Sequence, residues 1–337
     1  MERAVRSIAA QAKGREDVNI RVLDDCSDSP TQLVLELLMR EGLIEYRSLT
    51  AHVDYSNTFR EMFRECPDSD WVWTFGDDDM LCNGALDFML DRLANAPPEL
   101  SFIHVAERQR ISGQKGVAHG KLIDLCCNFG WIEMTGFITG NITRGPLLAK
   151  AADTPNWQTY AKSAFVHSCA LLEALHAHDA QFIDLPLIDT QALQQTDETA
   201  ARWAADNIGA RYMYVAPAIE AMFEQGILRA KLPVKFFRYL TYHIWDRFIT
   251  FYLSDYLTQS RMWHDDWAVY IKLFADFLHD EEEAGRIRQD VDTARSMVML
   301  HAALKANNEM LAEQMQSMLE RRNVMPYPYS FVKPACS

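Results

Sequence analysis

The chain has 337 residues, of which 49% are hydrophobic and 24% charged, and its formal net charge is -14. This length suits one large domain or two ordinary ones, and the composition is that of a soluble globular protein. The acidic balance excludes a generic nucleic-acid binder, because such proteins present a basic face to phosphates.

Cysteine usage and the lack of sorting signals indicate the compartment. Seven cysteines are scattered along the chain without a C-x-x-C pair, as expected for reduced thiols in the cytosol. The sequence has no signal-peptide pattern and no apolar run long enough to span a bilayer. We therefore expect a cytoplasmic protein that is either free in solution or peripheral on the inner membrane face.

The N-terminal part alternates helix and strand patterns. Apolar residues at helical spacing predict helices, and short apolar runs followed by polar turn formers predict strands. In chain order we expect a helix over 1–13, a strand over 18–23, a helix over 33–38, a strand over 44–49 and a helix over 54–63. Strands that alternate with helices predict an α/β fold with a mostly parallel sheet covered on both faces.

The alternation continues beyond residue 70. We expect a strand over 71–75, a helix over 84–93, a strand over 101–105, a helix over 165–177 and a strand over 181–188. Residues 107–121 are polar, which predicts a mobile or hairpin segment. Residues 129–144 are rich in glycine and threonine. That composition is typical either of backbone packed close to a ligand or of a tight structural turn.

Two groups of carboxylates stand at the carboxyl ends of predicted strands. Asp24 and Asp25 follow the strand over 18–23, and Asp77, Asp78 and Asp79 follow the strand over 71–75. Ligands of such sheets bind beyond the carboxyl ends of the strands, so both groups can face one crevice. Three adjacent carboxylates repel one another without a counter-ion, and hard oxygen ligands suit Mg²⁺ or Mn²⁺. The alternative is a solvated acidic turn.

The sequence changes character near residue 200, beyond which helical periodicity dominates. We expect an α/β domain over 1–200, a helical region over 201–325 and a loose tail over 326–337. An aromatic and basic segment, residues 235–245, predicts either a core helix or a helix on a membrane surface. The apolar stripe of the last helix, residues 284–321, would cover the first domain or pair with another copy in a homo-oligomer.

Several of these stretches together resemble the family two glycosyltransferases with the GT-A fold. Their order and spacing match the family over roughly residues 4–90, and they are Ser7–Gln11, Ile20–Ser27, Ser56–Asn57 and Trp71–Leu81. Gly136–Arg144 also resembles a segment of bacterial O-antigen and capsule sugar transferases. Relatives begin with an apolar strand ahead of the first helix, whereas this sequence starts at the helix.

The resemblance implies a Rossmann-like GT-A domain that performs an inverting sugar transfer in polysaccharide biosynthesis. The donor would be a nucleoside-diphosphate sugar, the acceptor a glycan or lipid-linked glycan, and the cofactor Mn²⁺ or Mg²⁺. The positions implied to bind the nucleotide are Asp24, Asp25, Asn57 and Asp77. The positions implied to bind the metal are Asp77, Asp78 and Asp79.

An inverting transferase also needs a base that takes the proton of the acceptor hydroxyl. The Glu-Asp pair that relatives use is not evident in this sequence. His167 aligns closest to that position, and Asp153 and Glu133 are the other titratable candidates. The alternative for His167 is a histidine whose hydrogen bonds are satisfied on or within its helix.

Two other functions fit parts of the sequence. A sugar-phosphate nucleotidyltransferase also uses carboxylates at strand ends, but it would need a Gly-rich basic N-terminal loop, which this sequence lacks. A degenerate, non-catalytic transferase domain that acts in binding or assembly agrees with the missing first strand. The intact run of Asp77, Asp78 and Asp79 argues against that degenerate domain.

Overall fold

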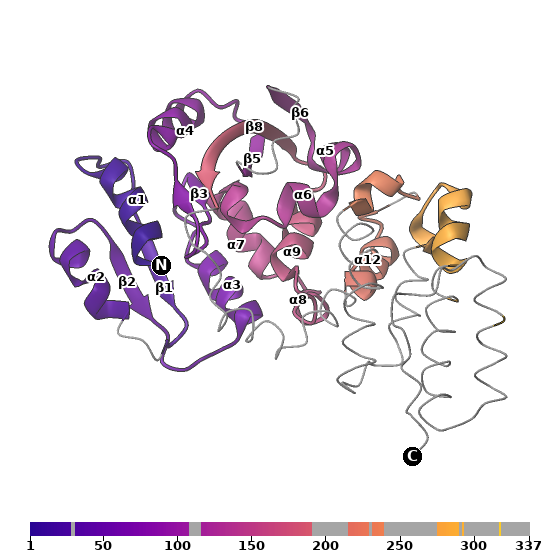
Figure 1. Ribbon diagram of the computed structural model, residues 1–337, viewed down its shortest axis with the longest axis horizontal. Helices are drawn as coiled ribbons and strands as arrows, with labels where there is room; N and C mark the ends of the chain where they lie inside the picture. Colours follow the sequence, from indigo (N-terminus) through magenta and orange to yellow (C-terminus); the bar gives the residue numbers. More distant parts are fainter. Residues whose placement is uncertain are drawn as a thin grey trace, which may run out of the picture. The chain divides into compact units, whose positions relative to one another are not determined.

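The computed structural model describes residues 1–27, 31–107, 116–190, 215–228, 231–238, 275–289, 292 and 317. The chain forms two compact units, Met1–Thr241 and Tyr242–Ser337. The first unit carries all the labelled helices and strands of Figure 1. The overall class is α/β, as the alternating sequence patterns predict.

The first unit opens with an alternating segment of helices and strands (Figure 1). Its elements are α1 (Glu2–Ala12), β1 (Arg21–Asp24), α2 (Thr31–Arg40), β2 (Glu45–Ser48) and α3 (Tyr55–Arg64). Strands β1 and β2 form a parallel pair with Val22 opposite Tyr46. Leu35 and Leu38 of α2 and Val5 and Ala9 of α1 are buried in one cluster. This order of elements agrees with the sequence prediction.

The central sheet contains six described strands, in the order β3-β7-β5-β8-β4, with β6 paired to β8. Their bounds are β3 (Trp71–Trp73), β4 (Met80–Leu81), β5 (Leu100–Glu107), β6 (Val117–Lys121), β7 (Asn141–Arg144) and β8 (Asp179–Asp189). Strand β5 lies inside the sheet. Its consecutive residues Phe102 and Ile103 point to opposite faces of the sheet. Both are fully buried, so the sheet is covered on both faces at this strand.

The prediction of a mostly parallel sheet was wrong in its detail. Among the described strands, β1 with β2 and β5 with β8 are parallel pairs. The pairs β3–β7, β5–β7, β4–β8 and β6–β8 are antiparallel. The main reason is β7, which comes from the glycine- and threonine-rich segment and runs between β3 and β5. The β-branched Ile142 and Thr143 are buried there and suit a strand.

The remaining described helices of the first unit are mostly short. Their bounds are α4 (Ala85–Ala94), α5 (Leu122–Phe129), α6 (Trp131–Thr135), α7 (Gly145–Ala152), α8 (Trp157–Tyr160), α9 (Val166–Leu175) and α12 (Val215–Glu224), with 3-10 helices η1 (Ile138–Gly140) and η2 (Val234–Phe237). Helix α9 is mostly apolar and lies within the core, as its eight buried residues show. The predicted helices over 84–93 and 165–177 correspond to α4 and α9.

The predicted boundary at residue 200 lies outside the described residues. Helix α12, which we expected in a separate helical region, belongs to the first unit and packs against α8 and α9. In the segment 235–245, the described Phe236 and Phe237 are buried. The predicted last helix and the tail fall almost entirely outside the described residues, except that residues 281–289 are helical. No described helix combines the length and apolar character needed to cross a membrane.

Helix α1 is fastened to β4 through two polar side chains. The backbone N–H of Leu81 donates to the hydroxyl of Ser7 at 3.0 Å. The amide of Gln11 donates to the carbonyl of Cys82 at 3.0 Å and accepts from the N–H of Leu86 at 3.3 Å. These residues are the Ser7–Gln11 motif, which therefore holds the strand that follows the three aspartates.

We expect Gln11→Ala to lower the free energy of unfolding by about 1–3 kcal/mol, because it leaves backbone groups near β4 without their partner. Urea denaturation of the two proteins measures this difference. Gln32→Ala is the matched control, since Gln32 is exposed on α2 and its loss should change stability by less than about 0.5 kcal/mol. Equal stability of Gln11→Ala and the wild type would contradict the fastening role.

Candidate functional site

The three aspartates lie in a short turn between β3 and β4, residues 76–79, which we call the acidic turn. Asp77 and Asp78 are exposed to solvent, whereas Asp79 is only 7% exposed. Thr74 and Phe75 connect the half-buried strand β3 to the turn. The carboxylates of Asp77 and Asp78 are therefore accessible to solvent, and that of Asp79 is buried.

The acidic turn is attached to η1 through Thr139, which is 1% exposed. The N–H of Gly76 donates to the Thr139 hydroxyl at 2.9 Å, and that hydroxyl donates to Oδ2 of Asp79. The carbonyl of Thr139 accepts from the indole N–H of Trp73 at 2.7 Å. The glycine- and threonine-rich segment thus supports the aspartates, and its C-terminal part is strand β7.

The carboxylates converge near Gly76. A Cβ atom at Gly76 would lie 3.0 Å from Oδ1 of Asp78 and 3.2 Å from Oδ2 of Asp79, closer than ordinary contact. Among the described residues, no three His, Cys, Asp or Glu side chains are arranged to enclose a metal ion. Mg²⁺ is commonly held by one or two carboxylates together with substrate phosphates and water. The donor set of the acidic turn fits that partial form of coordination.

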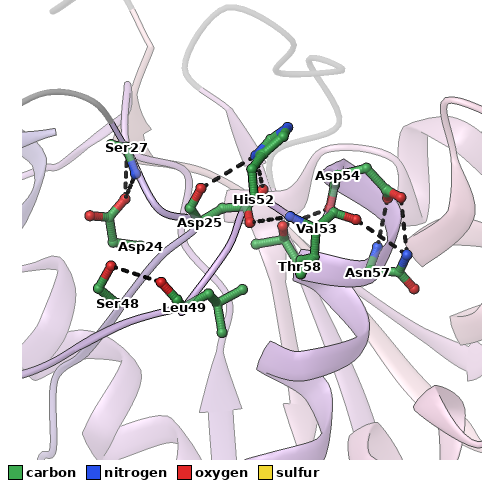
Figure 2. A network of polar contacts seen from close by, with 10 residues as sticks. All are labelled: Asp24, Asp25, Ser27, Ser48, Leu49, His52, Val53, Asp54, Asn57 and Thr58. Carbon is green, nitrogen blue, oxygen red and sulfur yellow. Dashed lines mark hydrogen bonds and ion pairs between the residues drawn. The ribbon is translucent and has the colours of Figure 1, made fainter.

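A second polar network lies at the carboxyl end of β1 (Figure 2). Asp24 is 8% exposed, and its Oδ1 accepts from the N–H of Ser27 at 3.1 Å and from its hydroxyl at 2.5 Å. Oδ2 accepts from the hydroxyl of Tyr46 at 2.6 Å. Burial raises the pKa of Asp24, but the bonds from Ser27 and Tyr46 outweigh it, so this pKa lies below its ordinary value. Asp24 is therefore ionised and engaged in shaping the loop.

The neighbouring Asp25 holds the loop that follows β2 (Figure 2). One carboxylate oxygen accepts from the N–H of Val53 at 2.8 Å, and the other lies 2.8 Å from Nδ1 of His52. The His52 side chain is 74% exposed and that of Asp25 19% exposed. The contact between His52 and Asp25 is the accessible part of the network.

The network continues to the first turn of α3, where Asp54 is the N-cap (Figure 2). Its Oδ1 accepts from the N–H of Asn57 at 3.0 Å, and its Oδ2 accepts from the Asn57 side-chain amide at 3.0 Å. Asp54 has φ 78°, a backbone conformation that a non-glycine residue rarely adopts. Asn57, which the resemblance places at the nucleotide, thus uses its amide to stabilise the start of α3.

His167 lies in the core, 2% exposed, at the start of α9. Its ring stacks on Phe59 with centroids 4.9 Å apart, and Nε2 donates to the carbonyl of Gly136 at 3.0 Å. Burial lowers the pKa of His167 to about 4, which the bond to Gly136 only partly offsets. The imidazole is therefore neutral at pH 7 and a weak proton acceptor. This burial argues against the base role predicted for His167.

The other two candidate bases also have local partners. Asp153 is exposed, follows α7, and accepts from Arg64 of α3 at 2.9 and 3.1 Å. Glu133 lies half-buried on α6 and folds back over Gly130, where a Cβ atom would lie 2.0 Å from its Oε2. Sequence reasoning missed the supporting roles of Thr139 and Tyr46, although it singled out the segment that contains Thr139.

Comparison with solved structures identifies the fold. By sequence, the chain matches no known protein family and no curated protein. It superimposes on S. aureus TarS 1–349 in complex with UDP-GlcNAc with a TM-score of 0.53 and 12% identity, covering 95% of this chain and 87% of that one. The same protein in complex with UDP gives a TM-score of 0.51 and 13% identity, with the same coverage of both chains.

A third structure of similar fold is that of a mannosyltransferase. The mannosyltransferase PcManGT from Pyrobaculum calidifontis, in complex with GDP-Man and Mn²⁺, has a TM-score of 0.50 and 12% identity. The superposition covers 95% of this chain and 75% of that one. The chain therefore has an α/β fold of the kind found in these transferases.

The burial of His167 predicts a specific dependence of stability on pH. Because its pKa is about 4 in the folded protein and 6.5 when unfolded, the unfolded chain binds the proton first as pH falls. The contribution of His167 to the free energy of unfolding is then fully present above pH 6.5. It is lost as the pH falls towards 4, by up to about 1.4 kcal/mol per pH unit. His167→Gln should lack this component in urea denaturation at stepped pH.

His119→Gln is the control, since His119 is exposed on β6, and its curve should run parallel to that of the wild type. A parallel curve for His167→Gln would show that His167 gains its proton while folded. A large loss of turnover in His167→Gln with donor affinity and pH-stability profile unchanged would instead support the base role.

Proposed function

We propose that the protein is a glycosyltransferase that takes its sugar from a nucleoside diphosphate. The observation that carries the proposal is the acidic turn between β3 and β4, in which Asp77 and Asp78 are exposed. The fold supports it, since TarS and PcManGT were solved with a nucleotide sugar. The four stretches that resemble family two glycosyltransferases support it independently of the fold.

Asp77 and Asp78 are the residues we assign to a divalent cation, and Asp79 is buried beside them and accepts a hydrogen bond from Thr139. PcManGT was solved with Mn²⁺, which supports a metal, either Mn²⁺ or Mg²⁺. Bound there, the cation would offset the negative charge of the diphosphate leaving group. Through that cation, Asp77 and Asp78 would hold and orient the diphosphate end of the donor.

The network at the end of β1 is proposed to receive the nucleoside. Asp24 is already engaged by Ser27 and Tyr46, so its role is to fix the loop. Asp25 and His52 present the accessible polar groups of the network. Asn57 stabilises the first turn of α3 beside them. We propose that this network and the acidic turn face one crevice.

We propose an inverting transfer to a glycan or lipid-linked glycan. The acceptor oxygen attacks the anomeric carbon opposite the diphosphate, the bond to the diphosphate breaks, and a base takes the hydroxyl proton. Of the candidates for that base, Asp153 is exposed but paired with Arg64, and His167 is buried. A lipid-linked acceptor would lie in the membrane, so the proposal includes a location at the inner membrane face.

Calorimetric titration of UDP, GDP, CDP and dTDP, each with and without Mn²⁺, tests the proposal. We expect one of the four to bind only with the metal, and Asp78→Ala to weaken that binding by at least about tenfold without lowering stability. Asp68→Ala is the control, because Asp68 is exposed and precedes β3, away from the acidic turn in sequence. It should bind as the wild type does.

Binding that is independent of Mn²⁺ and of Asp78 would contradict the metal site. If none of the four nucleotides binds under either condition, the proposed transferase activity is overturned. That result would favour a non-catalytic protein of transferase fold that acts in binding or assembly.

A further inference from the structure

We propose that His52 selects the nucleobase of the donor, because Asp25 holds Nδ1 of its ring and leaves the rest of the ring exposed, with Nε2 as a hydrogen-bond acceptor. The class selected is a nucleoside diphosphate whose base carries a proton on a ring nitrogen of its pairing edge, as uracil, thymine and guanine do. This inference rests on the proposed function, in which the network at the end of β1 receives the nucleoside.

The partners of Nδ1 determine which ring nitrogen of His52 carries the proton. Nδ1 lies 2.8 Å from Oδ2 of Asp25 and 3.3 Å from the backbone carbonyl oxygen of the same residue. An ionised carboxylate and a carbonyl oxygen only accept hydrogen bonds, so Nδ1 is the donor. A neutral imidazole has a single N–H, and its other nitrogen presents a lone pair. In the neutral ring of His52, Nε2 is therefore an acceptor.

The carboxylate that holds His52 is itself restrained. Oδ1 of Asp25 accepts from the backbone N–H of Val53 at 2.8 Å. Two consecutive residues of one loop, His52 and Val53, thus bind the two oxygens of one carboxylate (Figure 2). The Asp25 side chain is 19% exposed, whereas that of His52 is 74% exposed. The arrangement fixes the tautomer of a ring that a ligand can reach.

An acceptor of fixed tautomer distinguishes nucleobases by their ring nitrogens. Uracil and thymine carry a proton on N3 and guanine on N1, whereas N3 of cytosine and N1 of adenine are acceptors. A ring N–H donates to Nε2, but a ring lone pair that faces Nε2 leaves two acceptors unpaired and repelling each other. The exocyclic amines of cytosine and adenine reach Nε2 only if the base shifts in its plane. A ribose hydroxyl would give no such selectivity, because it rotates to donate or to accept.

Two substitutions test the two parts of this arrangement. His52→Ala removes the acceptor, and its effect on stability should be small because the side chain is exposed. Asp25→Asn retains the imidazole, but asparagine has one acceptor oxygen and cannot serve both the Val53 N–H and Nδ1–H of His52. His119→Ala is the matched control, since His119 is exposed on β6.

The experiment is calorimetric titration of UDP, GDP, dTDP, CDP and ADP in the presence of Mn²⁺, at about pH 8.5, well above the usual pKa of a histidine side chain. We expect the wild type to bind CDP and ADP at least about tenfold more weakly than the best of the other three. This ratio of Kd values should fall to within about threefold in His52→Ala and should persist in His119→Ala.

Asp25→Asn should also lower the ratio, although the imidazole is still present. The double variant of Asp25→Asn and His52→Ala should show the same ratio as His52→Ala, because both changes act on one acceptor. A loss of binding strength that is equal for all five nucleotides in both single variants would assign them a structural role and overturn the selection of the base.

Nuclear magnetic resonance reads the tautomer without any nucleotide. In long-range ¹H–¹⁵N correlation spectra of protein labelled with ¹⁵N-histidine, we expect the ring proton of His52 on Nδ1. The signal is identified by its absence from His52→Ala. A proton on Nε2 would overturn the inference, since that nitrogen would then be a donor.

The outcomes separate this inference from the proposed function. If nucleotides bind but His52→Ala leaves the ratio of Kd values as His119→Ala does, the role of His52 is overturned and the transferase proposal stands. Preferred binding of CDP or ADP by the wild type would have the same meaning. If none of the five nucleotides binds with or without Mn²⁺, the proposed function is overturned and this inference with it.

Discussion

The backbone pairing of β7 is the connection on which the rest of the first unit depends. This four-residue strand bonds to β3 on one side and to β5 on the other. Among the described strands, β7 is the one that links β3, which precedes the acidic turn, to the buried centre of the sheet. The turn before β7 also brings Thr139 to Asp79. One short segment therefore builds the sheet and supports the candidate site together.

Electrostatics explains why both candidate regions carry so many internal hydrogen bonds. Carboxylates that are partly buried stay ionised only where donors compensate for the lost hydration. Ser27 and Tyr46 supply those donors to Asp24. Asp77 and Asp78 remain hydrated at the surface. Hydrogen-bond donors of the protein thus bind the carboxylates that shape the loops, whereas water hydrates the carboxylates of Asp77 and Asp78.

Much of the fold could be predicted because apolar periodicity reports which face of an element is buried. Helix α1 and strand β1 follow from that signal alone, and α9 from an apolar run of helical length. Strand β7 escaped prediction because the glycines before it resemble a loop, whereas Ile142 and Thr143 carry the strand preference. The antiparallel pairs of the sheet were not predicted either, because the direction in which two strands pair depends on contacts between distant segments.

The candidate site was only partly predictable for a related reason. Asp77 and Asp78 could be singled out because consecutive carboxylates after a strand are unusual in any environment. The role of His167 could not be predicted, because the sequence around a histidine between apolar residues does not show whether its ring stacks on Phe59 or faces a substrate. Tyr46 is more than twenty positions from Asp24, and only the parallel pairing of β1 with β2 brings them together.

The conformation of Asp54 has a consequence for how this sequence can drift over evolutionary time. Glycine would relieve the unfavourable φ of 78° but would remove both hydrogen bonds to Asn57. Asparagine tolerates such a backbone and retains one acceptor, although its amide nitrogen would face a second donor. Serine and threonine could still accept from the Asn57 N–H but tolerate this backbone less well, and the remaining side chains lose on both counts. We therefore expect homologous sequences to keep aspartate there, with asparagine as the main substitute, even where the surrounding loop varies freely.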